Sequence, residues 1–229
     1  VAWHARLERV DPDGVLTKSM LDVARSSGGL WKVPASGALL FAVSAFLIGT
    51  VDAVTGIEPS VGVSYGAVMG LTAFTTYTLL TQFDSVDAYR ALPVSVPALF
   101  RAKRLAFLVL GTPTAVGYVL LAALLYGARP LEAVVGALLA AGLSVYLFGL
   151  TVALTGFSPN EFLYDTLLFA LFTAAVAVPL VPILIVGFVV VPVPGTLLVA
   201  IAVASVVLGG VGLGLYRVAV PRWERRYRA

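Results

Sequence analysis

The stretch DAYRALPVSVPALFRAKR, from Asp87 to Arg104, interrupts a chain that is almost free of charge on either side of it. It holds five charged residues and two prolines. The runs that flank it, Val61–Phe83 and Leu105–Tyr126, contain no charged residue. Apolar runs of about 20 residues are typical of transmembrane helices. We therefore interpret the stretch as a loop outside the membrane that joins two membrane-spanning helices.

The composition of the whole chain supports a membrane protein. The 229 residues are 60% hydrophobic and 12% charged, and the mean hydropathy is +1.00. Soluble domains are about 25% charged, because most side chains on a globule meet water. There is no cysteine, and His4 is the only histidine. Thiolate and histidine-cluster metal sites are therefore excluded, and we expect no cofactor to be bound by this chain.

The apolar runs predict an all-α integral membrane protein with six spans. The spans lie within residues 35–218. Residues 1–34 precede them, a loop at 84–104 lies between the second and third spans, and a basic tail at 219–229 follows the sixth. The predicted spans within residues 35–218 are Ala35–Val54, Val61–Phe83, Leu105–Tyr126, Leu131–Thr155, Pro159–Val190 and Gly195–Val218.

Lysine and arginine are strongly biased to one side of this topology. With six alternating spans, fourteen of the fifteen basic residues fall on the side of the two termini, and Arg129 alone falls on the other. Basic residues are retained on the cytoplasmic side. We therefore expect both termini and the 84–104 loop to be cytoplasmic, in a multi-pass protein of the plasma membrane.

Two further segments carry local signals. Leu16–Gly29 can form a helix in the membrane plane, with Thr17 as its N-cap, Gly28 as its stop and Met20, Leu21, Val23 and Ala24 against lipid, or it can be an ordinary polar tail. The fifth span is long for one crossing, and Pro179 and Pro182 predict a break near Val178–Pro182, followed by a short outer hairpin or a re-entrant piece before the sixth span.

The connection between spans four and five is predicted to be a short turn. Gly156 can end the fourth span, and Ser158 and Glu161 form a capping box around Pro159. The carboxylates of Glu161 and Asp165 could alternatively touch a cytoplasmic partner.

Small and hydroxyl-bearing residues mark the second and sixth spans. Glycines four residues apart favour close helix packing, either within one subunit or across a dimer; they are Gly62, Gly66, Gly70, Gly210 and Gly214. The polar residues of the second span are Thr72, Thr75, Thr76, Thr78 and Gln82. They could line a pathway for a weakly polar cargo, or the hydroxyls could bond to their own helix's carbonyls, which is the interpretation we favour.

Within the charged loop, Asp84 or Ser85 can cap a short helix of about Ser85–Leu92, which Pro93 ends. Ser95 can then cap the next helix, which continues into the third span. The short helix would lie across the membrane face and be available to a cytoplasmic partner.

The segment YRALPVSVPALFRAKRLA, Tyr89–Ala106, resembles the cytoplasmic loop of ABC-2 type transporter permeases. The matching residues are Leu92, Pro93, Val94, Ser95 and Lys103, although Ala102 stands where the family often has glycine. The resemblance implies a coupling helix that docks on an ATP-hydrolysing subunit, with contacts from Asp87, Arg90, Leu92, Pro93, Val94, Ser95 and Lys103. It also implies that this chain is half of an exporter and requires a second permease half.

Other classes of function are weighed against this one. An ion-coupled transporter usually keeps intramembrane carboxylates or histidines, and the middle of each predicted span has none. A membrane enzyme would need clustered histidines or carboxylates. The chain also lacks a phosphate-binding loop, so ATP hydrolysis is expected on a partner. A structural or assembly subunit of a larger membrane complex is the alternative, and nothing points to a nucleic-acid partner.

Overall fold

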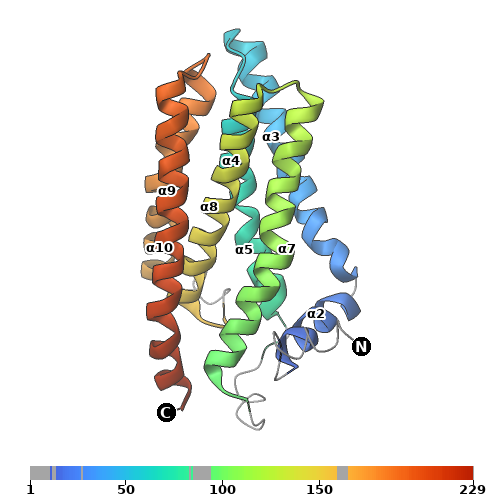
Figure 1. The fold of residues 1–229 in the computed structure, drawn as a ribbon, viewed down its shortest axis with the longest axis vertical. Coiled ribbons are helices and arrows are strands. Elements are labelled where there is room, and N and C mark those ends of the chain that lie inside the picture. The colour runs from blue at the N-terminus through green and yellow to red at the C-terminus, as the bar shows by residue number, and fades with distance from the viewer. Residues whose placement is uncertain are drawn as a thin grey trace.

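The structure, a computed structural model, describes residues 11, 14–26, 28–82, 84, 94–158 and 165–228. All regular structure in these ranges is helical, and the long helices run side by side along one axis (Figure 1). The elements are α2 (Val15–Arg25), η1 (Gly29–Trp31), α3 (Lys32–Thr55), α4 (Val61–Gly70), α5 (Thr72–Thr81), α7 (Val96–Leu125), α8 (Pro130–Thr155), α9 (Thr166–Val189) and α10 (Gly195–Arg228).

Five of these helical segments are long and apolar enough to cross a membrane. They are Gly29–Thr55, Val96–Leu125, Pro130–Thr155, Thr166–Val189 and Gly195–Tyr227. Large apolar side chains point outward from the bundle, among them Phe46 with 71% of its surface exposed and Leu124 with 82%. The all-helical, multi-pass architecture that the composition predicts is thus present.

The predicted second span, Val61–Phe83, is divided into α4 and α5 at Leu71. The backbone amide of Leu71 donates to the Val68 carbonyl at 3.0 Å, and that of Phe74 donates to the Leu71 carbonyl at 3.2 Å. These are i→i+3 bonds, so a single 3₁₀-like turn joins the two helices. Each helix has ten residues, and neither alone is long enough to cross a membrane.

Helix α8 is the centre of the bundle and is buried along most of its length, with α4, α7 and α10 around it (Figure 1). Glycines allow the backbones to touch. A methyl group at Gly66 would lie 2.5 Å from the carbonyl oxygen of Gly136, and one at Gly149 would overlap the carbonyl of Gly212. Gly142 meets Ser205 in the same way.

The glycine contacts of the second span therefore lie within the chain. Gly62 and Gly66 pack against the α8 backbone and Gly70 against the side chain of Leu143. For α10, packing of the predicted glycines within the chain is not found, while packing across a dimer stays a prediction. Nothing lies within 4 Å of a methyl group placed at Gly210 or Gly214. Gly212, which the four-residue spacing did not select, makes the contact with α8 instead.

Helix α9 runs without a break through Pro179 and Pro182, so the predicted break near Val178–Pro182 is wrong. Proline at position 179 leaves the Ala175 carbonyl without its usual helical donor. The hydroxyl of Tyr146 on α8 donates to that carbonyl at 2.9 Å. A neighbouring helix thus replaces the missing bond, as membrane helices with internal proline require. Residues 190–194 then turn the chain into α10.

The boundaries around the α8–α9 connection are partly as predicted. Gly156 ends α8 as its C-cap, in agreement with the sequence. Helix α9 begins at Thr166, and the Asp165 carboxylate accepts from the amides of Leu167 and Leu168 at 3.0 Å each. The capping box proposed for Ser158, Pro159 and Glu161 reaches into 159–164, outside the described residues.

Helix α2 lies at the end of the bundle where α10 ends (Figure 1). Its N-cap is Gly14, and the Asp11 carboxylate accepts from the amides of Leu16 and Thr17 at 2.8 Å each, so the prediction of Thr17 as N-cap is wrong. Partial burial raises the pKa of the Asp11 carboxyl, but the hydrogen bonds from Thr17 and Leu16 outweigh it and hold the pKa below its usual value.

The predicted lipid-facing side of α2 is also only partly correct. Leu21 and Ala24 are exposed, but Val23 is buried and packs into the bundle. The helix ends at Arg25 with Ser26 as its C-cap, before the predicted stop at Gly28.

Helix α10 continues beyond the predicted sixth span. It runs from Gly195 to Arg228 without interruption, through Pro221, so the predicted tail at 219–228 is helical. Its 34 residues correspond to about 51 Å, against about 30 Å for the apolar core of a bilayer. The last turns of α10 therefore extend beyond the apolar layer.

Candidate functional site

One end of the bundle, here called the basic end, gathers almost all the basic side chains. It is formed by α2, the start of α3, the end of α5, the start of α7, the end of α8 and the end of α10 (Figure 1). Among the described residues, Arg129 is the only lysine or arginine at the opposite end. The described basic residues at the basic end are Lys18, Arg25, Lys32, Arg101, Lys103, Arg104, Arg217, Arg222, Arg225 and Arg226.

A buried ion pair joins α7 to the segment that follows α5. The ammonium of Lys103 lies 2.9 Å from the Asp84 carboxylate, and both side chains are 1% exposed. The same ammonium donates to the Leu80 carbonyl at 2.5 Å, near the end of α5. Two opposite charges taken out of water together attract strongly, because the surrounding dielectric constant is low. The pair therefore ties together the two ends of the 85–94 segment.

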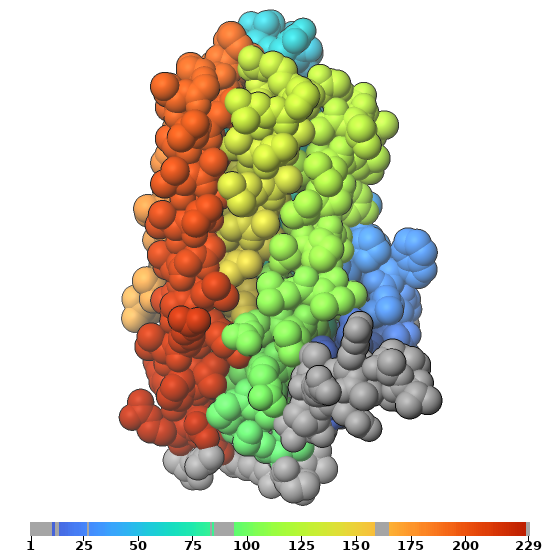
Figure 2. Space-filling model, viewed as in Figure 1, coloured from blue at the N-terminus to red at the C-terminus, as the bar shows by residue number. Residues whose placement is uncertain are grey.

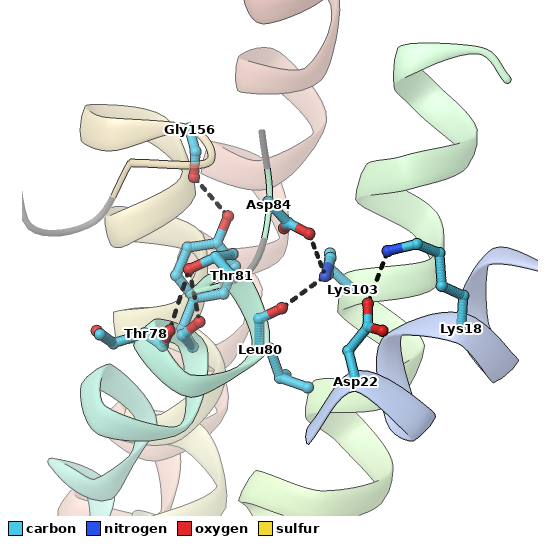
Figure 3. A network of polar contacts seen from close by, with 9 residues as sticks. Lys18, Asp22, Thr78, Leu80, Thr81, Asp84, Lys103 and Gly156 are labelled. Carbon is cyan, nitrogen blue, oxygen red and sulfur yellow. Dashed lines mark hydrogen bonds and ion pairs between the residues drawn. The ribbon is translucent and has the colours of Figure 1, made fainter. Parts of the chain in front are cut away.

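Helix α2 contributes a second ion pair beside the first one. Lys18 and Asp22 approach to 2.6 Å and are partly exposed, whereas Lys103 and Asp84 lie deeper, between α2 and the end of α5 (Figure 3). The buried Val15, Leu16 and Val23 of α2 belong to the same apolar cluster as residues of α5 and α7. Helix α2 therefore packs against the region where the Lys103–Asp84 pair joins α7 to the segment that follows α5.

The residues predicted to contact an ATP-hydrolysing partner divide into three groups. Asp87, Arg90, Leu92 and Pro93 lie outside the described residues. Ser95 caps α7 as predicted, with its hydroxyl accepting from the Ala98 amide at 3.4 Å, and the half-buried Val94 packs against the core. Lys103 requires a correction, because its buried ammonium is turned toward Asp84 and does not lie on a surface that a partner could touch.

A cluster of rings holds the basic end of α8 in place. Tyr77 donates to the Gly156 carbonyl at 2.5 Å, and the Trp223 indole donates to the Val152 carbonyl at 2.8 Å. Phe157 stacks on Phe100, with ring centroids 4.2 Å apart. Sequence reasoning missed this cluster, because its members come from α5, α7, α10 and the residues around the end of α8. The only signal was the presence of aromatic residues near helix ends.

Three of the four predicted threonine hydroxyls bond to carbonyls three or four residues earlier in the chain. Thr76 donates to the Thr72 carbonyl at 2.9 Å and Thr78 to the Phe74 carbonyl at 3.0 Å. Thr72 donates to the Met69 carbonyl at 2.7 Å. These bonds agree with the interpretation favoured from the sequence. Thr75 is half-buried and Gln82 is exposed at the end of the helix, so the five residues do not share one lining surface.

At the opposite end, a buried carboxylate was not anticipated from the sequence. Glu132 in the first turn of α8 is 6% exposed. It accepts a hydrogen bond from the Ser60 hydroxyl at 2.9 Å and one from the Arg129 Nε at 2.8 Å. Ser60 also caps α4. These hydrogen bonds hold the starts of α4 and α8 together, so the role of Glu132 is structural.

Neither end offers a metal-binding group within the described residues, where no three histidine, cysteine or acidic side chains gather. Comparison of the chain with protein-family models, with curated proteins and with solved structures finds no match. The candidate site is therefore the basic end itself, and its most specific feature is the Lys103–Asp84 pair.

Proposed function

We propose that this chain is the transmembrane half of an ATP-binding cassette exporter in the plasma membrane. In this proposal the α4–α5 pair is the second of six spans, and the basic end faces the cytoplasm. The 84–104 loop docks on a separate ATP-hydrolysing subunit, and a second permease half completes the transporter. The observation that carries the proposal is the buried Lys103–Asp84 pair, which closes this loop.

The Lys103–Asp84 pair is placed so that it couples the end of α5 to the start of α7. Leu80 and Asp84 flank the end of α5, and Lys103 lies in the second turn of α7. A partner that pushes the loop would move both helices together, since separating the two charges within the low-dielectric interior is costly. In the ABC-2 permeases that the loop resembles, a lysine at the head of the third span is part of the motif. A buried, paired Lys103 gives this motif position a mechanical role.

Helix α7 is suited to transmit such a push. It is continuous over 30 residues from its Ser95 cap, which corresponds to about 45 Å. Helix α5 is separated from α4 by the turn at Leu71, while α4 is packed backbone to backbone on α8. In this mechanism α5 and α7 tilt together and α4, α8 and α10 remain as the fixed part.

The test of docking uses Leu92→Asp, because Val94 is partly engaged in the core. The chain is co-expressed with a candidate ATP-binding subunit from the same genome, and the two are purified together. Burial of one leucine at an interface contributes about 1.5–3 kcal/mol, so we expect binding to weaken at least about tenfold. Ala128→Asp, which adds the same charge at the opposite end, is the matched control and should bind normally.

Two outcomes would contradict the proposal. If the Leu92→Asp variant retains the ATP-binding subunit and still stimulates its ATP hydrolysis, the loop is not the coupling element. If the wild-type chain holds no ATP-binding subunit at all, the chain is better explained as a structural or assembly subunit of a larger membrane complex.

A further inference from the structure

Two arginines stand where neighbouring helices leave the apolar layer at the basic end. Helix α7 has no charged residue from Leu105 to Tyr126, and α10 has none from Gly195 to Tyr216. Each uncharged run has 22 residues, or about 33 Å, which matches the apolar core of about 30 Å. Arg104 immediately precedes the first run and Arg217 immediately follows the second.

The structure brings these two positions to the same level. The guanidinium of Arg104 lies over the ring of Tyr216, 5.1 Å from its centroid, and Arg217 is the next residue of α10. Figure 2 shows α10 and α7 meeting on the same face of the molecule toward the basic end. Arg217 is exposed, and its place next to Tyr216 in α10 puts a second basic residue at the level of Arg104.

Neither guanidinium is paired with a carboxylate of the described residues. Within the described residues, Arg104 makes its ring contact and no ion pair, and Arg217 makes neither an ion pair nor a hydrogen bond. Stacking on a ring engages the face of a guanidinium, while its N–H donors point outward in its plane. Donors of this geometry match the oxygens of a phosphate.

An apolar side chain lies one turn deeper on each helix. Leu108, four residues into α7 from Arg104, is 38% exposed, and Leu213, four residues into α10 from Arg217, is 39% exposed. Residues four apart lie on the same face of a helix. On each helix the arginine therefore lies nearer the basic end, and an exposed leucine lies one turn deeper. This order matches that of a phospholipid, whose charged headgroup lies outside its acyl chains.

We propose that Arg104 and Arg217 bind the phosphate of an anionic phospholipid in the leaflet at the basic end, with its acyl chains along Leu108 and Leu213. The depth of the arginines and the leucines beneath them favour a lipid over a soluble anion. The site does not depend on the proposed transport function, because it requires only that the helices be inserted in a bilayer.

The experiment titrates the detergent-solubilised full chain with dioleoylphosphatidylglycerol and counts bound lipids by native mass spectrometry. Near an anionic membrane each arginine contributes about a fivefold gain in affinity, so Arg104→Gln with Arg217→Gln should weaken binding about 30-fold. Arg217→Gln alone, at an exposed position that makes no ion pair or hydrogen bond within the described residues, should weaken it about fivefold. That single variant keeps the test valid if the loss of the Tyr216 contact disturbs folding.

The matched control removes two other arginines of the same helix. Arg222 and Arg225 lie about 7.5 and 12 Å further out along α10, and replacing both with glutamine should change the affinity by about twofold at most. Equal losses in the two double variants would mean a diffuse attraction to the basic end and would overturn the site. Equal binding of dioleoylphosphatidylcholine, or displacement of the lipid by millimolar inorganic phosphate, would overturn its assignment to an anionic lipid.

Discussion

At the scale of single residues, the Lys103–Asp84 pair is the most consequential feature of the molecule. A buried charge is tolerated only when a partner and hydrogen bonds replace the water it has lost. Lys103 has Asp84 and the Leu80 carbonyl. Loss of one partner would leave the other charge uncompensated in an apolar environment, whereas loss of both would leave an uncharged and still well-filled interior.

We therefore expect Lys103→Met to lower the free energy of unfolding in detergent by about 3–5 kcal/mol. The double variant Lys103→Met with Asp84→Asn should recover most of that loss. Lys18→Met, which breaks the partly exposed pair with Asp22, is the control and should cost about 0–1 kcal/mol. The measurement is denaturant-induced unfolding followed by tryptophan fluorescence. If the double variant is no more stable than Lys103→Met, the two side chains are not coupled.

At the scale of the helices, close backbone contacts organise the bundle around α8. Small residues let helices approach in membranes, where apolar side chains gain little from leaving lipid. Gly66 and Gly136 meet between α4 and α8, and Gly149 and Gly212 meet between α8 and α10. The glycines that do not meet another helix, such as Gly214, are available for comparison.

Two alanine substitutions within α10 test this organisation. A methyl group at Gly212 would lie 2.7 Å from the backbone nitrogen of Tyr146, so Gly212→Ala must push α10 away from α8. We expect it to lower the free energy of unfolding by about 1–3 kcal/mol. Gly214→Ala has open space and should leave stability unchanged or raise it by up to about 1 kcal/mol. Thermal unfolding in detergent distinguishes them, and equal melting temperatures would contradict the packing described for α10.

At the scale of the whole molecule, the charges and the apolar surface define an axis. Exposed side chains such as Phe46 and Val109 lie near the middle of their helices, while basic side chains gather at one end. Lysine and arginine are strongly disfavoured from crossing to the outer side during insertion. This asymmetry predicts that the basic end is cytoplasmic.

Single cysteines test this orientation directly, because the native chain has none. Ser26→Cys and Ser95→Cys, both at the basic end, should resist a membrane-impermeant thiol reagent applied to intact cells. Glu58→Cys, between α3 and α4 at the opposite end, should be labelled, and all three should react after the membrane is permeabilised. Labelling of Ser26→Cys or Ser95→Cys in intact cells would reverse the orientation.

The sequence by itself determined the features that depend on local composition. Uncharged runs located the long helices, the Ser95 and Gly156 signals marked helix ends correctly, and the distribution of arginine and lysine separated the two ends. These inferences hold because hydrophobicity and the helix-end signals of Ser95 and Gly156 act within a few residues of the chain. A loose motif around Lys103 also pointed to the loop that became the candidate site.

Contacts between helices decided the rest, since they join residues far apart in the sequence. The hydroxyl of Tyr146 allows α9 to pass Pro179 unbroken. The direction in which each glycine faces selects Gly212 over Gly210 and Gly214 for contact with α8. Asp84 and the Leu80 carbonyl turn Lys103 inward. The motif could identify Lys103, but its burial depends on the tertiary structure. The groups that compensate its charge, the Leu80 carbonyl and Asp84, lie at and just after the end of α5, whereas Lys103 lies on α7.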